Sequence, residues 1–319
     1  MNDAKSVPLS QQNVTVKKNS LRTRIVYHKY MYIMLLPTMV YFIIFKYLPM
    51  YGIQLAFKDH FIRAGIWGSP WIGLENFRML FNNIQFMRAF RNTIIISVGR
   101  ILFTFAVPVF IALLLNEIRH LIFKKVIQLI LYLPHFLSWV IISGMMYGLL
   151  SVNGGVINKI IEFFGGEPIA FLLKPDMFRP LIYISIIWKE MGWSSIIYLA
   201  ALSSINPELY EAAIVDGANR FRQMVHITWP GIKSTVVIML ILATANIMNA
   251  GFNQIFNLYS PSVYSTGDII DTMVYREFFL NGEFGVGTAA DFFKAVIGCL
   301  LIFSVNKIAK KLNEGQGLY

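Results

Sequence analysis

The chain has 319 residues, of which 56% are hydrophobic and 14% are charged, and its formal net charge is +11. An ordinary soluble domain has about a quarter charged residues, and one as apolar as this chain would expose large hydrophobic patches. The composition therefore excludes an ordinary soluble protein and predicts a membrane protein. The lysines and arginines lie between apolar runs rather than along one polar face, so we expect no nucleic-acid partner.

Several apolar segments are long enough to cross a bilayer as helices, which takes about 20 residues each. Six such segments lie at about residues 31–50, 93–115, 126–150, 181–203, 233–257 and 290–309. The sequence therefore predicts an all-α polytopic membrane protein with six transmembrane helices within residues 30–311. Residues 1–29 lack the apolar core of a signal peptide, so we expect tails at 1–29 and 312–319.

Positive charge sets the orientation of membrane helices, because cytoplasmic flanks carry an excess of Lys and Arg. One set of flanks holds Lys17, Lys18, Arg22, Arg24, Lys29, Arg119, Lys124, Lys125, Arg220, Arg222, Lys233, Lys310 and Lys311. We therefore expect both termini in the cytoplasm, together with the loop 206–230 between the fourth and fifth segments.

The second apolar segment contains a charged residue and the third contains a pair of glycines, and each of these features indicates a role. Arg100 is a charge within the second segment, and the sequence does not identify its partner. Gly144 and Gly148 in the third segment form a GxxxG pattern, which favours close packing against another helix.

The fourth segment carries further candidates for a polar path. Lys189 is an intramembrane charge, and Trp188 and Trp193 offer aromatic faces that suit sugar rings. Tryptophan near a membrane interface is more often an anchoring residue, so both interpretations of the tryptophans stay open.

The loop 206–230 predicts two short helices that meet at a glycine. Asn206 is a good N-cap, and Glu208 and Glu211 put negative charge in the first turns, where the helix dipole favours it. Gly217 can take the left-handed conformation that ends the first helix. On the residues alone, this amphipathic segment could also be a surface helix whose arginines contact anionic lipids.

The same loop resembles a known signature. Glu-Ala-Ala, a later Asp-Gly and a closing Ile-x-x-Pro resemble the EAA loop of binding-protein-dependent ABC importer permeases, with Trp229 in the place of the usual Leu. The matching and adjoining residues that this resemblance assigns to ATPase coupling are Glu211, Ala212, Ala213, Asp216, Gly217, Arg220, Ile227 and Pro230. In that family the loop is a coupling helix that docks on a separate ATPase subunit.

The resemblance extends over nearly the whole chain. "YLPMYGIQLAFKDH" after the first segment and "GLENFRMLF" at 73–81 are similar to the carbohydrate-uptake branch, in particular to LplB-type oligosaccharide permeases. This implies a permease in a bacterial plasma membrane that pairs with a second, nonidentical permease. It also implies two copies of an ABC ATPase, which bind ATP and Mg, and an extracellular binding lipoprotein that delivers a carbohydrate.

The chain itself shows no enzyme motif. It has no G-x-x-x-x-G-K-[ST], so ATP hydrolysis falls to other subunits and we expect no cofactor on this chain. Its single cysteine and its five histidines lack metal-ligand spacing, so we expect no metal site and no catalytic residue. "DGANRF" is similar to the start of a phosphotransferase motif, but the next aspartate after Asp216 is Asp268, across a membrane segment.

The fifth segment offers the best evidence of a substrate path. Its amides at Asn246, Asn249, Asn253 and Asn257 would share one narrow stripe of a continuous helix. They could hydrogen bond to other helices or line a sugar path, and both uses stay open. With the fourth segment, the predicted substrate-path residues are Asn246, Asn249, Asn253, Trp188, Trp193 and Lys189.

An ion-coupled secondary transporter is the alternative function. Such transporters contain inverted repeats and helices that are broken near the middle of the membrane. The sequence shows no convincing internal repeat, and the EAA resemblance has no role in that mechanism.

Overall fold

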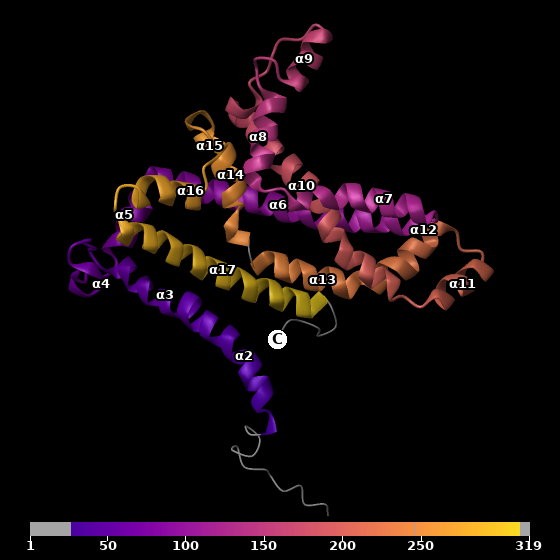
Figure 1. Cartoon of the computed structure of the whole chain (residues 1–319), viewed down its shortest axis with the longest axis horizontal. Coiled ribbons are helices and arrows are strands. Elements are labelled where there is room, and N and C mark those ends of the chain that lie inside the picture. Colours follow the sequence, from indigo (N-terminus) through magenta and orange to yellow (C-terminus); the bar gives the residue numbers. More distant parts are fainter. Residues whose placement is uncertain (1–26, 246, 313–319) are drawn as a thin grey trace, which may run out of the picture. The chain divides into compact units, whose positions relative to one another are not determined.

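The computed structural model describes residues 27–245 and 247–312, and it is built from helices (Figure 1). No strand occurs in these residues, and the single antiparallel bridge that they contain joins Lys58 to Trp71. Backbone polar groups in hydrocarbon must be satisfied within their own segment, and a helix does this. The predicted all-α class is confirmed.

The chain divides into two units, the first ending at Ile53 and the second beginning at Gln54. The first unit contains one long helical run, which continues into the start of the second. Its elements are α2 (Lys29–Phe42), the π-helix Ile43–Tyr47, α3 (Leu48–Met50) and the 3-10 helix Tyr51–Phe57. No residue of α2 is buried, and Lys29–Phe57 is long and apolar enough to cross a membrane.

The second unit holds the other helices. They are α4 (Gly65–Gly68), α5 (Glu75–Asn82), α6 (Ile84–Glu117), α7 (Leu121–Tyr132), α8 (Trp139–Leu150), α9 (Val156–Phe163), α10 (Pro175–Ser203), α11 (Pro207–Val215), α12 (Arg220–Gln223), α13 (Trp229–Ala245), α14 (Phe252–Leu258), α15 (Tyr264–Gly267), α16 (Ile270–Val274) and α17 (Phe284–Leu312). Short 3-10 or π-helices lie between them at Leu133–Phe136, Phe171–Leu173, Met224–Thr228, Ile247–Asn249, Pro261–Val263 and Tyr275–Phe279.

Length and composition identify four continuous helices in the described residues that could span a membrane: Lys29–Phe57, Ile84–Glu117, Arg220–Thr244 and Phe284–Lys307. A fifth candidate is the pair Leu121–Phe136 and Trp139–Leu150, which is bent by 101°. The fourth predicted segment lies in α10, which is long enough but is not among the helices that pass on hydropathy. A polytopic protein is therefore supported, and the count of six spans stays a prediction.

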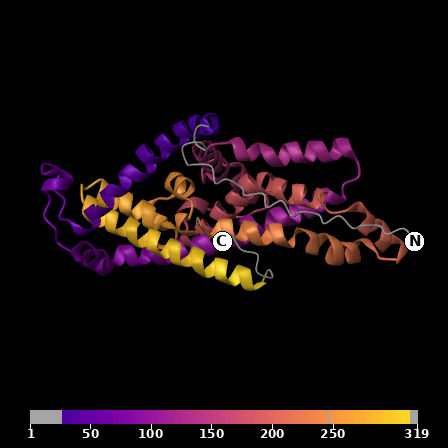
Figure 2. The same ribbon diagram turned by 90° about the horizontal axis from the view of Figure 1, so that it is seen from below.

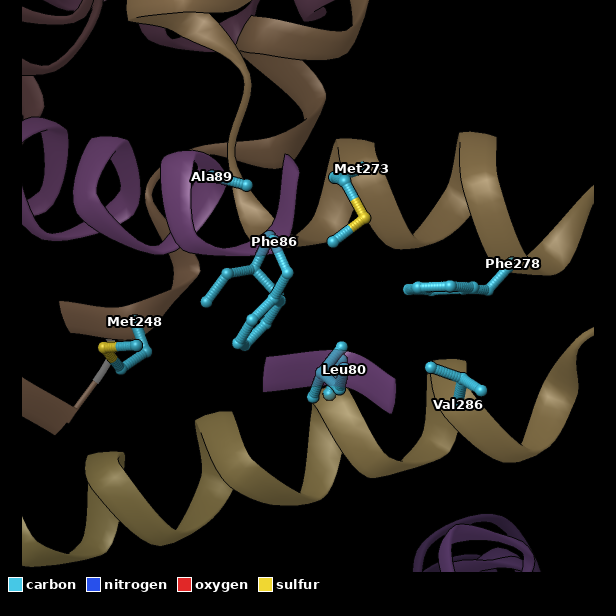
Figure 3. Close-up of a cluster of buried hydrophobic side chains, with 9 residues drawn as sticks. Leu80, Phe86, Ala89, Met248, Met273, Phe278 and Val286 are labelled. Atoms are coloured by element: carbon cyan, nitrogen blue, oxygen red, sulfur yellow. The ribbon is translucent and has the colours of Figure 1, made fainter. Parts of the chain in front are cut away.

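Helix α6 runs through the core of the second unit. It lies along α10, which also packs against α7, while α13 and α17 pack against each other (Figures 1 and 2). Phe86 and Ala89 of α6 belong to a buried cluster with residues of α5, α16 and α17, which Figure 3 shows. Ile96 belongs to a second cluster with α10 and α14, and Val109 to a third with α10 and α13.

Close helix packing occurs at glycines other than the predicted pair. A Cβ on Gly192 of α10 would collide with the backbone carbonyl of Leu131 in α7, and one on Gly99 of α6 would collide with the Tyr183 ring. Nothing in the described chain lies within 4 Å of a Cβ built on Gly144 or Gly148. Among the described residues, the expectation of close packing at the GxxxG pattern is therefore not met.

The fifth apolar segment is not one continuous helix. Helix α13 ends at Ala245, a short 3-10 helix covers Ile247–Asn249, and α14 begins at Phe252. Between them Ala250 and Gly251 have φ values of +20° and +85°. The predicted single stripe of asparagines is therefore wrong for Asn249, Asn253 and Asn257, because a break in the helix separates the first from the other two. Asn246 lies outside the described residues.

The break predicts a strong effect of a small substitution. In Gly251→Ala the alanine would have to keep the left-handed φ of this position. Its Cβ would also collide with the guanidinium of Arg100. We expect a loss of about 1–3 kcal/mol of stability, measured by thermal unfolding of the purified protein. Gly144→Ala is the control, because that helical glycine has open space around it. Equal unfolding temperatures for both variants would contradict the prediction.

Candidate functional site

The segment 206–230 folds as the sequence predicts. The Asn206 side chain accepts a hydrogen bond from the Glu208 backbone N–H at 3.1 Å and begins α11. Gly217 ends that helix with φ +74°, and the Ala218 N–H donates to the Ala213 carbonyl at 2.8 Å. These are the contacts of a glycine-terminated helix. Asn219 then caps α12 in the same way, through the N–H of Arg222 at 2.9 Å.

Few contacts attach this segment to the rest of the second unit. Within the segment, the hydroxyls of Tyr210 and Thr228 are 3.0 Å apart and join α11 to the end of the π-helix Met224–Thr228. Arg220 of α12 forms an ion pair with Glu117, the last residue of α6. The segment therefore contacts α6 at the C-terminal end of that helix.

Apolar side chains of the segment are exposed instead of being packed. No residue of α11 or α12 is buried. Val215 is 87% exposed and Phe221 is 67% exposed, and Leu209 and Ile214 are exposed as well. Exposed apolar groups next to exposed charges are typical of a surface that contacts another protein or the membrane. Glu211 and Asp216 are also exposed, as are Ala212, Gly217 and Pro230, while Ala213 and Ile227 are half-buried.

A cavity of about 480 Å³ lies at the break between α13 and α14. Its lining residues come from α6, α8, α13, α14 and the break itself: Ser97, Arg100, Ile101, Thr104, Trp139, Ala243, Ile247, Asn249, Ala250, Gly251, Phe252 and Asn253. Asn249 and Asn253 are exposed, so the cavity is open to the surface. Amides, hydroxyls and two aromatic rings give the cavity both hydrogen-bonding groups and apolar faces.

A buried polar network holds the break in place. Arg100 Nη1 donates to Gln254 Oε1, and Gln254 Nε2 donates to the Ile182 carbonyl at 2.7 Å and to Ser185 Oγ at 2.8 Å. Gln254 is fully buried. One side chain of α14 thus links α6 to α10, and its own polar atoms are all satisfied, as burial requires.

The predicted substrate-path residues do not all meet in this cavity. Asn249 and Asn253 line it, whereas Trp188 lines a separate apolar cavity of about 270 Å³ beside α8. Trp193 stacks on the ring of His135, with ring centroids 4.5 Å apart. Nδ1 of His135 is in turn 2.9 Å from Oε2 of Glu190.

Lys189 serves the bend between α7 and α8. Its ammonium donates to the carbonyls of His135 and Leu137 at 2.6 Å each, and it lies 5.8 Å from the centre of the Trp139 ring. These carbonyls lie where the helix is interrupted, so they lack the backbone N–H donors of a continuous helix. Lys189 therefore lies outside the cavity lining, and its ammonium satisfies backbone carbonyls of the bend.

The predicted substrate path does not include Arg100, Gln254 or Trp139. The sequence marks Arg100 as an intramembrane charge without identifying its partner, and no pattern in it singles out Gln254 or Trp139. Arg100 and Gln254 are 154 positions apart, so no local pattern links them. The signal that was available is the rarity of Arg and Gln inside apolar segments, since such residues usually face one another or a cavity.

Two neighbouring cavities share lining residues with the first. One of about 490 Å³ includes Asn249, Asp291 and Lys294, and one of about 350 Å³ includes Phe252, Asp271 and Asp291. Lys294 forms an ion pair with Asp271. Charged groups of α16 and α17 therefore line the cavities next to the one that contains Arg100.

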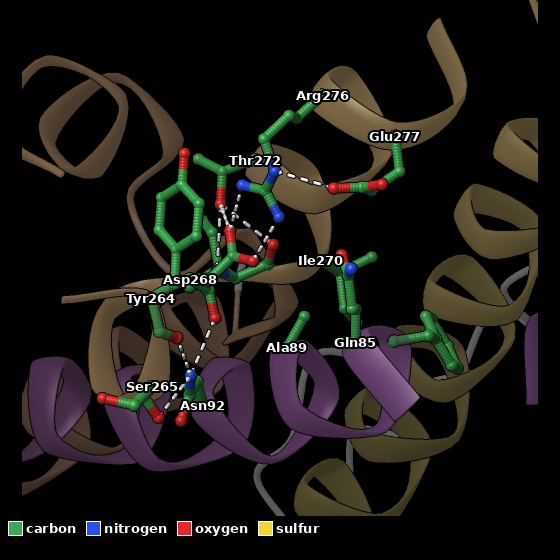
Figure 4. Close-up of polar contacts among 12 residues, drawn as sticks. Gln85, Ala89, Asn92, Tyr264, Ser265, Asp268, Ile270, Thr272, Arg276 and Glu277 are labelled. Carbon is green, nitrogen blue, oxygen red and sulfur yellow. Dashed lines mark hydrogen bonds and ion pairs between the residues drawn. The ribbon is translucent and has the colours of Figure 1, made fainter. Parts of the chain in front are cut away.

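Polar contacts fix the segment 264–277 against the first turns of α6 (Figure 4). The Asn92 side chain donates to the Asp268 carbonyl at 3.0 Å, and the Asp268 carboxylate accepts two hydrogen bonds from Arg276, at 2.7 and 3.1 Å. Burial alone would lower the pKa of Arg276, but the hydrogen bonds and the charge of Asp268 raise that pKa above its usual value. Arg276 is therefore a permanent cation in this cluster.

Comparison with known proteins identifies the family. Residues 104–311 match the family described as "Binding-protein-dependent transport system inner membrane component". The chain belongs to this family. It is therefore a multi-pass membrane permease and a transport component rather than an enzyme, and the resemblance inferred from the EAA-like loop is confirmed.

Relatives match nearly the full length of this permease. It is 45% identical over 303 residues to the polygalacturonan/rhamnogalacturonan transport system permease protein YteP of Bacillus subtilis (strain 168), covering 95% of this chain and 94% of the relative. It is also 45% identical to protein LplB of the same organism, over 91% of each chain. The LplB-type resemblance is confirmed by this match.

A solved importer has the same fold. A chain in the crystal structure of a bacterial ABC transporter involved in the import of the acidic polysaccharide alginate matches with a TM-score of 0.86 and 40% identity. The match covers 92% of this chain and 99% of that one. A second crystal structure of an alginate ABC transporter, in complex with a pentasaccharide-bound periplasmic protein, also has a TM-score of 0.86.

The position of Lys189 leads to a test of its role. Lys189→Met leaves two half-buried carbonyls of the bend without their donor, so we expect a loss of about 1.5–3 kcal/mol in thermal unfolding. The control is Lys159→Met on the exposed surface of α9, where we expect a change within about 0.5 kcal/mol. If Lys189→Met unfolded normally but abolished transport, Lys189 would act on the substrate path instead.

Proposed function

We propose that this permease is one half of the membrane channel of an ATP-driven ABC importer, and that it carries an oligosaccharide delivered by an extracellular binding lipoprotein. The observation that carries the proposal is the segment 206–230. It is exposed, apolar in part, ended by a left-handed glycine and joined to α6 by the Arg220–Glu117 ion pair. A segment built in this way suits a joint with a soluble motor protein.

The proposed assembly contains other chains that complete the importer. A second, nonidentical permease forms the other half of the channel, and two copies of a cytoplasmic ABC ATPase bind ATP and Mg. We place both termini and the segment 206–230 in the cytoplasm of a bacterial cell, because the basic flanks cluster on that side. The loops around Asp268 then lie on the outer side, where the binding lipoprotein docks.

The coupling mechanism is alternating access. The ATPase pair closes and moves residues 211–217, and Gly217 allows α11 and α12 to keep their angle while they move as a unit. Arg220 transfers the displacement to Glu117 at the end of α6. Because α6 also contributes Arg100 to the cavity, movement of this helix changes the cavity lining as the access side changes.

The cavity at the break is the proposed sugar path. Asn249 and Asn253 can donate to and accept from hydroxyls, and Trp139 and Phe252 offer apolar faces to sugar rings. Relatives of this permease are named for the transport of polygalacturonan/rhamnogalacturonan, xylose/arabinose and trehalose/maltose. These relatives support a carbohydrate substrate.

Gly217 tests the coupling role. Proline requires a φ near −65°, so Gly217→Pro cannot keep the observed +74°, and we expect substrate-stimulated ATPase activity of the assembled importer to fall at least about ten-fold. Gly165→Pro is the matched control, because Gly165 also has a left-handed φ, +81°, and open space around it, but lies after α9. Unchanged stimulation in Gly217→Pro would leave the segment as a surface helix.

Uptake measurements distinguish the proposed importer from an ion-coupled transporter. In proteoliposomes that hold ATP inside, we expect the assembled importer to take up sugar after ionophores collapse the ion gradients. Uptake that stopped with the gradients while ATP stayed high would favour the ion-coupled mechanism.

The amides of the cavity lead to a separate prediction. Asn249→Leu and Asn253→Leu each remove hydrogen bonds to the passing sugar, so we expect uptake to fall by about two- to ten-fold. Asn257→Leu is the control, because Asn257 lies on α14 outside the cavity lining. Equal uptake in all three variants would leave the asparagines with a packing role.

A further inference from the structure

Arg100 is a charged side chain in the middle of the longest apolar helix of the second unit. Helix α6 spans Ile84–Glu117 and passes the length and hydropathy requirements of a membrane span. The guanidinium lines the cavity of about 480 Å³, lies against Gly251 and donates from Nη1 to Gln254. A neutral amide satisfies one of the five N–H groups that a guanidinium carries, but it does not balance the charge.

The described residues provide no carboxylate in contact with this guanidinium. No Asp or Glu oxygen among them lies within 4.0 Å of an Arg100 nitrogen, and Glu190, which attracts Arg100 from farther away, is hydrogen bonded to His135. A charge within a membrane segment is costly unless a counter-charge or water compensates it. Arg100 thus offers an electrostatic site for an anion on the wall of the cavity.

The rest of the cavity lining is neutral. Its polar side chains are those of Ser97, Thr104, Asn249 and Asn253, and Arg100 is its single charged residue. The acidic groups Asp271 and Asp291 line the two neighbouring cavities, where Lys294 lies with them. An anion that enters the first cavity therefore meets one cation, neutral hydrogen-bonding groups and aromatic rings.

We infer that Arg100 binds the carboxylate of an acidic sugar unit as the oligosaccharide passes the break. The inference rests on the proposed importer function and narrows its substrate to oligosaccharides that contain uronate-type units. A guanidinium matches a carboxylate geometrically, through two parallel N–H donors, and is always charged. Hydroxyls of the same sugar unit would meet Asn249 and Asn253, and its apolar face would meet Trp139 or Phe252.

Arg100 also has a structural role that the experiment must separate from binding. It connects α6 to α14 through Gln254. Loss of the arginine would leave Gln254 Oε1 without this hydrogen-bond donor. A purely structural role would impair the transport of every substrate by the same factor. A carboxylate-binding role impairs the transport of acidic substrates alone.

The test measures initial uptake by the complete importer, with its partner permease, ATPase and binding lipoprotein, in proteoliposomes that contain ATP. The probes are a labelled galacturonate oligosaccharide and its methyl ester, which has the same backbone without the charge. For Arg100→Gln we expect uptake of the acid to fall about ten-fold or more, and uptake of the ester to change less than about two-fold. Arg100→Lys should give an intermediate loss, and Arg119→Gln, at an exposed position after α6, should change neither.

A second measurement does not depend on the binding lipoprotein. Thermal unfolding of the detergent-purified permease and ATPase assembly is followed with millimolar acid or ester. The wild-type assembly should be stabilised by the acid alone, because a bound ligand raises the unfolding temperature. Arg100→Gln should lose that shift. If this variant does not fold, Arg100→Lys and the difference between acid and ester in the wild-type assembly decide the result.

Several results would overturn the inference. They are an equal loss of acid and ester uptake in Arg100→Gln, unchanged acid uptake in that variant, and equal stabilisation of the wild-type assembly by both probes. A wild-type importer that carries neutral oligosaccharides but no acid would reject the uronate inference and leave the importer function intact. A wild-type assembly that carries no oligosaccharide of either kind with ATP present would reject both.

Discussion

The constraint on which the site depends is the need to satisfy polar groups at a helix break inside an apolar protein. Helix α13 stops at Ala245 and α14 begins at Phe252, and Gly251 between them has a left-handed φ. The guanidinium of Arg100 lies against that glycine and bonds to Gln254, which in turn bonds to α10. In lipid, interrupted backbone is tolerated only where protein or a cavity surrounds it. The break and the cavity therefore require each other.

Helix α6 connects the parts of the permease that carry its proposed function. Its first turns hold the cluster around Asp268, its middle carries Arg100, and its last residue, Glu117, pairs with Arg220 of the segment 206–230. Three buried apolar clusters pack along it in succession. Closely packed interiors do not deform smoothly, so a displacement at one end of α6 is transmitted along the helix. Helix α6 is thus a physical connection between the segment 206–230 and the cavity.

Polar residues in the apolar segments have two different uses, which their residue types alone do not separate. Lys189 donates to the carbonyls of His135 and Leu137 at the bend between α7 and α8, and so satisfies backbone that has no helical partner. Arg100 bonds to one neutral amide and keeps its charge facing a cavity. The difference lies in the acceptors around each cation. A lysine surrounded by carbonyls stabilises a fold, and an arginine beside an open cavity can bind a ligand.

Local sequence was sufficient for the membrane class, the helical fold and the segment 206–230, because these depend on composition and on contacts between near neighbours. Asn206 reaches two residues ahead, and Gly217 supplies a φ that few other residues adopt. The break at Gly251, the partner of Arg100 and the acceptors of Lys189 were decided only by the tertiary structure. Gln254 is 154 positions from Arg100, and the carbonyls that bind Lys189 are 52 and 54 positions away. Spacing along one helix cannot reveal such contacts, because packing between distant helices determines which polar groups meet.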